Sequence, residues 1–436
     1  MNRRALLTSV GAATFFSGCL DRRNDTPTDN PNWEQQADRA IRANRTTELD
    51  IKVTNRFGIP VPGAAVTVEM TAHDFRFGTA VNAPHLVHEA ERGDPYRAHL
   101  SKLFNTAVLA VRHKWKPWET PADRELADHA TEWLLDNGFD VRGHTVLWQD
   151  LDSGAVPEDV VTKLESDDPD RSDYLAERTT NHIRDIVGHY AGLTDWDLLN
   201  EHVDNHSITE AIAPNEPPQQ SPPLIEWFET AAAVAPDTDL YCNDYNLIVG
   251  DEEDHREQFE TLIAYLQNAD APIDGIGMQG HFGSLDAAIG PNELRDLLDR
   301  YAALGVDLQV TEYDTFGQGW TEQDEADHLA VVLKTLFGHP AVVGFLMWGF
   351  WDGIHWQNNA PLFREDWSTK PAYDVYVDLV FDEWWTHETG RTGLDGNYST
   401  RAFLGNYEIT ATWDGYSTTV TTSLTEPTAD TIVVRI

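Results

Sequence analysis

The chain has 436 residues, with 73 acidic and 31 basic side chains and a formal net charge of -42. This length can bury a large core and accommodates one large domain with a smaller one, so we expect a globular protein. The negative charge argues against nucleic acid as a partner, because phosphate groups would be repelled, and it disfavours anionic membrane surfaces for the same reason.

The acidic excess runs through the whole chain. Only seven of the 31 basic residues are Lys, which leaves 31 - 7 = 24 Arg. Few Lys beside many Asp and Glu resembles the composition of proteins from salt-loving archaea. We therefore expect a halophilic protein whose surface charges need salt to screen their mutual repulsion.

Residues 1–32 are predicted to be an export segment and a tether. Arg3 and Arg4 precede a short apolar run, which ends at Cys19. This order resembles a Tat signal followed by a lipobox whose Cys19 becomes lipidated; a simple uncleaved anchor is the alternative. We expect an exported protein, extracellular or held at the cell surface, that contacts the membrane only through its lipid.

Two β-rich segments flank the rest of the chain, at residues 33–74 and 383–436. Apolar residues alternate with polar ones in both, and turn residues separate the runs. Together they resemble the two halves of a carboxypeptidase-regulatory-like (transthyretin-like) β-sandwich. We predict one small sandwich, split by an inserted domain.

Residues 75–382 alternate between strand-like and helical patterns, which is typical of an α/β protein. The expected strands are Phe75–Val81, Asn105–Val111, Asp140–Trp148, Trp196–Asn200, Leu240–Asn246, Gly275–His281, Asp307–Asp314 and Val342–Phe350. Eight such strands predict a (β/α)₈ TIM barrel, whose active site would lie at the carboxyl ends of the strands.

Glu201 and Glu312 each follow a short apolar strand. A buried carboxylate is costly unless it is paired or used, and paired carboxylates are what glycosidic bond cleavage requires. Strand parity places Asp197 beside Glu201 and Asp314 beside Glu312. We interpret Glu201 as the general acid, kept protonated by the nearby carboxylate, and Glu312 as the nucleophile; two structural, salt-bridged glutamates are the alternative.

Further polar and aromatic side chains stand at predicted strand ends. His144 and Trp148 share a face of the third strand, and Gln279 and His281 share one of the sixth. We expect His281 to donate to Glu312 while Asp314 holds its ring from behind.

Eight motifs in order resemble glycoside hydrolase family 10, the endo-β-1,4-xylanase family. They are Phe77–Asn82, Lys114–Trp115, Arg142–Trp148, Trp196–Glu201, Asn243–Asn246, Gly275–His281, Thr311–Asp314 and Trp348–Gly349.

The resemblance implies a retaining hydrolase that acts by double displacement on a polysaccharide, with Glu201 as acid/base and Glu312 as nucleophile. It implies neither cofactor nor metal, and we expect a monomer. The implied contacts are sugar binding by Lys114, His144 and Asn200, orientation of the carboxylates by Gln279 and His281, and stacking walls from Trp148, Trp348 and Trp356.

The chain departs from the family where the second sugar would bind, because Ala110 and Val111 stand where a Glu-Asn pair is usual. A family relative acting on another β-glycan is therefore an alternative, and a non-catalytic surface carbohydrate-binding protein is a second one. His202 and His206 could suggest a metal site, but retaining glycosidases need no metal.

The charge predicts that the fold depends on salt. Transfer from molar salt into dilute buffer should unfold the protein, because unscreened acidic groups repel one another. Circular dichroism during stepwise dialysis measures this. An unfolding temperature that stays unchanged across the salt series would contradict the halophilic interpretation.

Overall fold

The computed structural model describes residues 32–89, 94–426 and 430–436. The predicted export segment, including Cys19, lies outside these residues. Within the described ranges, no helix has the length and apolar character needed to cross a bilayer.

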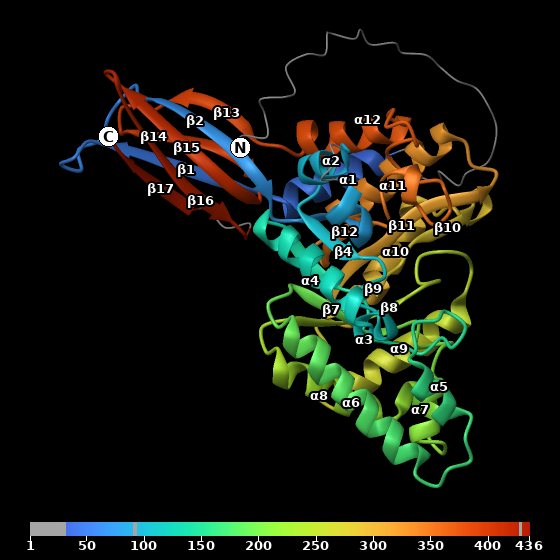
Figure 1. Cartoon of the computed structure of the whole chain (residues 1–436). Helices are drawn as coiled ribbons and strands as arrows, with labels where there is room; N and C mark the ends of the chain where they lie inside the picture. The colour runs from blue at the N-terminus through green and yellow to red at the C-terminus, as the bar shows by residue number, and fades with distance from the viewer. Residues whose placement is uncertain (1–31, 90–93, 427–429) are drawn as a thin grey trace.

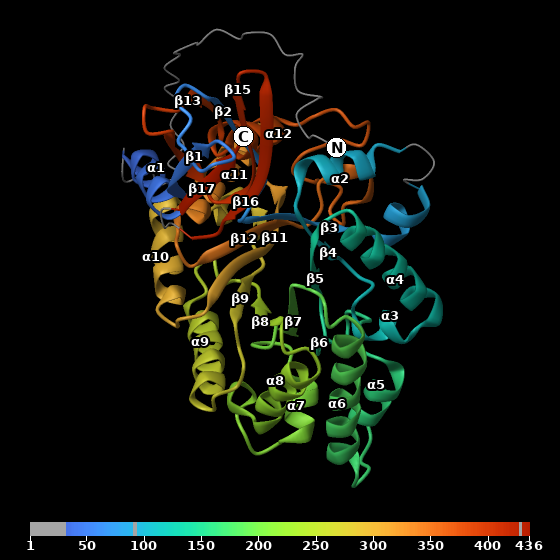
Figure 2. The same cartoon turned by 90° about the vertical axis from the view of Figure 1, so that its left-hand side faces the viewer.

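Eight parallel strands close into a barrel in this part of the chain, as predicted (Figure 2). Closure is completed by pairing of the seventh strand with the sixth and of the eighth with the first. In order around the barrel the strands are β3 (Arg76–Val81), β4 (Thr106–Leu109), β5 (Asp140–Gly143), β7 (Asp195–Asn200), β8 (Asp239–Asp244), β9 (Gly275–Met278), β11 (Asp307–Gln318) and β12 (Val342–Met347).

Three strands end three or more residues before the ends that the sequence predicts. The third breaks after Gly143 and resumes as β6 (Leu147–Trp148), and the sixth stops at Met278 before β10 (His281–Ser284). The eighth ends at Met347. The chain therefore leaves the regular ladder just where the candidate site residues begin, and this frees their side chains to turn into the opening of the barrel.

Helices surround the barrel and cover its apolar strands (Figure 2). They are α2 (Tyr96–Leu103), α3 (Trp115–Glu119), α4 (Pro121–Asp136), α5 (Glu158–Leu164), α6 (Arg171–His189), α7 (Ser207–Ile212), α8 (Pro222–Val234), α9 (Glu253–Asn268), α10 (Pro291–Ala302), α11 (Glu322–Gly338) and α12 (Pro371–Val377). Cys242 is buried in the core beneath them, as expected of a packed thiol.

Strands from both ends of the chain form two further sheets beside the barrel (Figure 1). The first sheet has the order β14-β1-β17 and the second has the order β13-β2-β15-β16. Their bounds are β1 (Thr46–Thr54), β2 (Ala65–His73), β13 (His387–Arg391), β14 (Asn397–Phe403), β15 (Gly405–Trp413), β16 (Tyr416–Leu424) and β17 (Asp430–Arg435).

One apolar cluster, separate from the barrel core, joins the two sheets. It includes Leu49 and Ile51 from β1, Val68 from β2 and Ile409 from β15. The barrel is thus inserted between β2 and β13, and the strands on either side of it complete each other's sheets. The likeness to a carboxypeptidase-regulatory-like sandwich stays a prediction.

Helix α1 (Trp33–Asn44) was not predicted, because residues 33–74 as a whole were expected to belong to the β-sandwich. This helix packs on the barrel instead: Ile41 belongs to the barrel core, and Asn44 donates to the carbonyl of Gly338 at the end of α11. A Cβ at Gly338 would lie only 3.3 Å from Cβ of Ala40. Small residues therefore permit the close approach of α1 to α11.

Arg45 fastens the junction between α1, β1 and the barrel. Its Nε donates to the carbonyl of Phe337 at 2.7 Å, and its Nη2 donates to the carbonyls of His339 at 2.6 Å and Val342 at 2.5 Å. Burial lowers the pKa of Arg45 to about 10, although Asp74 opposes this effect. These bonds tie the start of the small domain to the amino end of β12.

Replacing Arg45 by Met should lower the free energy of unfolding by about 2–3 kcal/mol, because three carbonyls lose a charged donor. Thermal unfolding in molar salt measures the loss. The exposed Arg56→Met variant is the control and should change stability by less than about 0.5 kcal/mol. Equal unfolding temperatures for the two variants would contradict the fastening role.

Candidate active site

A cavity of about 470 Å³ opens at the carboxyl ends of the barrel strands, and we call it the cleft. All ten side chains that the sequence suggested for catalysis or substrate binding line it. They are Lys114, His144, Trp148, Asn200, Glu201, Gln279, His281, Glu312, Trp348 and Trp356. Asp197 and Asp314 lie buried behind the wall.

Glu201 follows the last residue of β7 and has a left-handed backbone, with φ of 55°. Three side-chain groups donate to its carboxylate. The amide of Gln279 reaches Oε1 at 2.9 Å, while the indole N–H of Trp148 at 2.9 Å and the amide of Asn205 at 3.1 Å reach Oε2. All three donors are neutral, and within the described residues no cation forms a salt bridge with this carboxyl group.

The surroundings of Glu201 favour its protonated form. Burial raises the pKa of Glu201 above its ordinary value, and the negative charges of Glu312 and Asp244 raise it further, while the hydrogen bonds from Gln279 and Trp148 oppose the shift. Glu201 therefore keeps its proton to a higher pH than an ordinary glutamate does.

Glu312 has cationic neighbours instead. The amide of Asn243 donates to its Oε1 at 2.7 Å, Nε2 of His281 lies 3.3 Å from its Oε2, and Nδ1 of His144 lies 4.0 Å from Oε1. Burial by itself would raise the pKa of Glu312. The attraction of His144, the hydrogen bond and charge of His281 and the charge of Lys114 reverse this and hold the pKa below its ordinary value. Glu312 is therefore set to remain ionised.

His281 joins Glu312 to Asp314, as the sequence predicts. Its Nδ1 lies 2.7 Å from Oδ1 of Asp314, and the indole N–H of Trp356 donates to the other Asp314 oxygen at 2.7 Å. Burial would lower the pKa of His281, but Asp314 and Glu312 together raise it to about 10. The imidazolium charge between the two carboxylates stabilises the ionised state of both.

The prediction that Asp197 lies beside Glu201 is wrong. Its Oδ1 accepts from Arg142 at 2.7 Å and its Oδ2 lies 2.9 Å from Nδ1 of His144, so it supports the Glu312 side of the cleft. The reason is a register shift between Asp197 and Leu199 in the pairing of β7 with β8. Strand parity does not carry across a bulge, and the left-handed backbone of Glu201 turns its side chain further.

Asn243, near the end of β8, belongs to one of the eight motifs, but no role was predicted for it. Its amide donates to both Glu312 and Oδ1 of Asn200, the latter at 2.8 Å. Its own oxygen accepts from the Thr311 hydroxyl at 2.7 Å. A Cβ at Gly277 would stand 2.3 Å from this oxygen, so glycine is needed on the neighbouring strand. The strand-end position of Asn243 was the available signal.

Asn205 is a second residue that was passed over. It lies one turn after Glu201, and its backbone N–H donates to the carbonyl of Glu201 at 2.9 Å while its side chain reaches the carboxylate. A spacing of four residues after a catalytic glutamate could have suggested it.

Trp148, which was expected to stack on sugar rings, also contacts Glu201 and Lys114. Besides its bond to Glu201, its ring lies 4.4 Å from the ammonium nitrogen of Lys114. Burial lowers the pKa of Lys114, an effect that Glu312 and Glu201 oppose. One face of this indole is therefore taken by a cation.

The loop after β12 supplies the outer wall, including Trp356. The buried ammonium of Lys370 binds three oxygen atoms of this loop. It donates to Asp352 at 2.9 Å, to Oδ1 of Asn359 at 2.8 Å and to the carbonyl of Ala360 at 2.8 Å. Asn359 in turn donates to Glu325 on α11 at 2.6 Å. The wall is thus anchored to the barrel through buried polar contacts.

Ala110 and Val111 line the cleft where the family usually carries polar residues. Val111 is 44% exposed, so an apolar surface faces any sugar bound there.

His202 is a structural residue. Its Nε2 bonds the carbonyl of Pro218 at 3.1 Å and its Nδ1 lies 3.3 Å from the amide of Gln149. Burial lowers the pKa of His202 to about 4, so it is neutral. The described residues contain no group of three side chains suited to hold a metal ion.

The raised pKa of His281 leads to a test by NMR. In the wild type its imidazole should stay protonated through neutral pH; in Asp314→Asn it should titrate at lower pH, because the chief opposing charge is gone. His328, whose pKa burial lowers to about 3, should stay neutral in both and serves as the internal control.

The raised pKa of His281 also determines how this residue affects the stability of the fold at different pH values. Because the pKa of His281 is raised from 6.5 to about 10, its protonation stabilises the fold fully below pH 6.5, and this stabilisation is lost as pH rises through 10. Titration of His281 near 6.5 in the wild type would contradict the description of this triad.

Comparison with known proteins agrees with this geometry. Glycosyl hydrolase family 10 matches residues 67–379. The anti-sigma-I factor RsgI6 of Acetivibrio thermocellus is 28% identical over 407 residues, which cover 91% of this chain and 50% of that protein. Endo-1,4-beta-xylanase 1 of Arabidopsis thaliana is 27% identical over 353 residues, which cover 80% of this chain and 34% of that protein.

A solved structure of GH10 from Paenibacillus barcinonensis shares the fold, with a TM-score of 0.61 at 24% identity over 71% of this chain and 95% of that one. This chain spans half or less of the length of the two curated relatives named above. Because the family match covers most of the barrel together with its cleft, the chain belongs to glycosyl hydrolase family 10.

Proposed function

We propose that this chain is a secreted, retaining endo-β-1,4-glycosidase that hydrolyses xylan-type polysaccharide. One observation carries the proposal: the buried Glu312 and the partly buried Glu201 share a cleft, and their pKa values are shifted in opposite directions. Such a pair supplies an acid and a nucleophile at the same pH. Family membership and the xylanases among the relatives support the choice of substrate.

In the first step the ionised Glu312 attacks the anomeric carbon and forms a glycosyl ester. The bond from this carbon to the leaving oxygen breaks, and Glu201 gives its proton to that oxygen. Asn243 and His281 hold the Glu312 carboxylate in position while its charge moves onto the new bond.

In the second step Glu201, now ionised, takes a proton from water. The resulting hydroxide attacks the anomeric carbon and the ester bond to Glu312 breaks, so both carboxyl groups return to their starting state. Two displacements at one carbon leave its configuration unchanged.

A second candidate substrate is another β-glycan, such as mixed-linkage glucan or a decorated xylan. The apolar Ala110 and Val111 favour it, because they offer no hydrogen bond to the second sugar. A product profile from defined β-1,4-oligosaccharides separates the two substrates.

A second class of function is glycan binding without catalysis. The match over 91% of this chain to a protein named as an anti-sigma factor favours a role other than hydrolysis. The opposed glutamates favour catalysis. Release of reducing sugar from xylan in molar salt supports the enzyme, and its absence with every β-glycan would support the binding protein.

Export, lipid attachment through Cys19 and a monomeric state form part of the proposal. The amino-terminal sequence supports the first two.

The Glu312→Ala variant should lose turnover by several orders of magnitude, because no nucleophile remains to form the ester. Added azide should restore part of the activity by attacking the anomeric carbon directly, in a single displacement. The product would then be a glycosyl azide of inverted configuration, which NMR identifies.

Glu229→Ala is a suitable control, because this glutamate is exposed on α8 and lies outside the cleft. It should keep turnover in molar salt and should not respond to azide. Turnover like that of the wild type in Glu312→Ala would refute the assignment of the nucleophile.

A further inference from the structure

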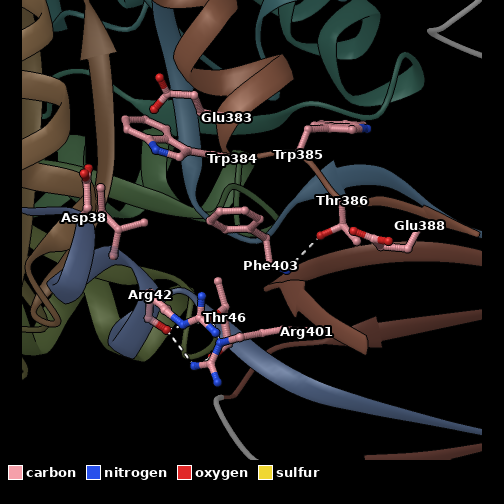
Figure 3. Close-up of a pocket in the computed structure, with 11 residues that line it drawn as sticks. Asp38, Arg42, Thr46, Glu383, Trp384, Trp385, Thr386, Glu388, Arg401 and Phe403 are labelled. Atoms are coloured by element: carbon pink, nitrogen blue, oxygen red, sulfur yellow. Dashed lines mark hydrogen bonds between the residues drawn. The ribbon is translucent and has the colours of Figure 1, made fainter. Parts of the chain in front are cut away.

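A second pocket, of about 460 Å³, lies where the chain passes from the barrel into the small domain (Figure 3). We call it the junction pocket. Helix α1, the start of β1, the segment after Glu383 and the end of β14 form its walls. Its volume lies within the range of about 300–1,000 Å³ that small-molecule sites occupy.

The junction pocket is remote from the cleft. Strand β2 ends at His73 and β3 begins at Arg76, so the small domain joins the barrel at the amino ends of its strands. Thr46 lines the pocket directly after Arg45, which bonds the carbonyl of Val342 at the amino end of β12. The cleft opens at the other ends of the strands, so the pocket is not one of its subsites.

Two consecutive tryptophans have different surroundings here. Trp384 is 3% exposed and stacks on Phe337 with ring centres 4.3 Å apart, so it belongs to the core. Trp385 is only partly buried, and two rings pack against its own: His73 nearly perpendicular to it, with ring centres 5.3 Å apart, and Phe381 tilted by 41°, with ring centres 5.7 Å apart. It therefore offers a fixed apolar surface to the pocket, which suits the C–H face of a sugar ring.

Hydrogen-bonding groups of both kinds surround this surface. Figure 3 shows Arg42 and Arg401 on one side and Glu383 beside the tryptophans on the opposite side. Arg401 is held in place, because its Nε donates to the Thr46 hydroxyl at 2.6 Å and its Nη2 donates to the carbonyl of Arg42 at 2.8 Å. The Arg42 guanidinium has no ion pair within the described residues.

Charge in the junction pocket is nearly balanced. Two arginines line it together with three carboxylates, from Asp38, Glu383 and Glu388, and Lys334 lies 3.9 Å from the first two of these carboxylates. A phosphate or a polyanion would meet these carboxylates and the strongly acidic surface around them. An uncharged ligand rich in hydroxyl groups can accept from the arginines and donate to the carboxylates.

We propose that the junction pocket is a second, non-catalytic binding site for an uncharged β-linked pyranose chain, with Trp385 as its stacking surface and Arg42 as a hydrogen-bond donor. The identity of the sugar as xylan rests on the proposed function. This site holds the protein on an insoluble polymer while the cleft cuts another stretch of chain.

The test uses the full chain in molar salt, with Glu312→Ala as the background so that bound glycan is not consumed. Trp385→Ala and Arg42→Ala should each weaken binding to insoluble xylan, Trp385→Ala by about tenfold. Trp413→Ala is the matched control, because this tryptophan is 44% exposed on β15 outside the pocket, and it should bind as the background does.

A second measurement keeps Glu312 intact and follows hydrolysis of soluble xylotetraose, which is too short to need anchoring. Trp385→Ala should leave this rate unchanged. If Trp385→Ala lowers it as much as it lowers binding to the polymer, the residue acts through the fold and the proposal fails. Arg42 is exposed, so Arg42→Ala still tests the pocket if Trp385→Ala does not fold.

Failure of this proposal and failure of the proposed function give different results. Xylan hydrolysis together with unchanged polymer binding in both pocket variants overturns the second site alone. If no xylan is cut, the same binding assay on mixed-linkage glucan and cellulose decides the matter: binding lost on Trp385→Ala supports the site, and binding that withstands the substitution overturns it.

Discussion

The opposite electrostatic surroundings of two carboxyl groups, Glu312 buried and Glu201 partly buried, determine what this barrel can do. Glu201 is held by neutral donors and lies near other carboxylates, so its proton is retained. Glu312 lies among His144, His281 and Lys114, so its charge is retained. Without this difference the two groups would titrate alike, and neither could serve as acid while the other serves as nucleophile.

Buried charges in the barrel interior support this difference. Asp195 accepts from Arg76 at 2.9 Å and also pairs with Arg142, which reaches Asp197 and through it His144. Isolated charges at these positions would be strongly unfavourable, whereas a chain of pairs is tolerated and fixes the orientation of the imidazole. The positive side of the cleft is thus anchored in the core of the barrel.

Much of the barrel could be predicted because each strand is a short apolar run bounded by turns. The link from His281 to Asp314 and Glu312 was predicted from parity, and it holds although the sixth strand stops at Met278, before His281. The prediction from strand parity was wrong for Asp197, because β7 has a bulge between Asp197 and Leu199. An apolar sequence pattern does not reveal such a bulge. The role of Asn243 was not predicted, because its contacts depend on the register between neighbouring strands.

Helix α1 and the junction pocket were beyond prediction for a related reason. Ile41 is buried in the barrel core, against residues far away in the sequence. The partial exposure of Trp385 beside the buried Trp384 depends on how the small domain packs on the barrel. A sequence shows which residues are apolar, but not which of two adjacent tryptophans enters the core.

The pH dependence of kcat/KM on an aryl β-xylobioside with a good leaving group, measured in molar salt, tests the division of roles most directly. The wild type should give a bell, with its acid limb at a lower pH and its basic limb at a higher pH than an ordinary glutamate would give, because Glu312 must be ionised and Glu201 protonated. Glu201→Ala should keep the acid limb and lose the basic limb. A basic limb that persists in Glu201→Ala, or an acid limb that disappears with it, would contradict the account.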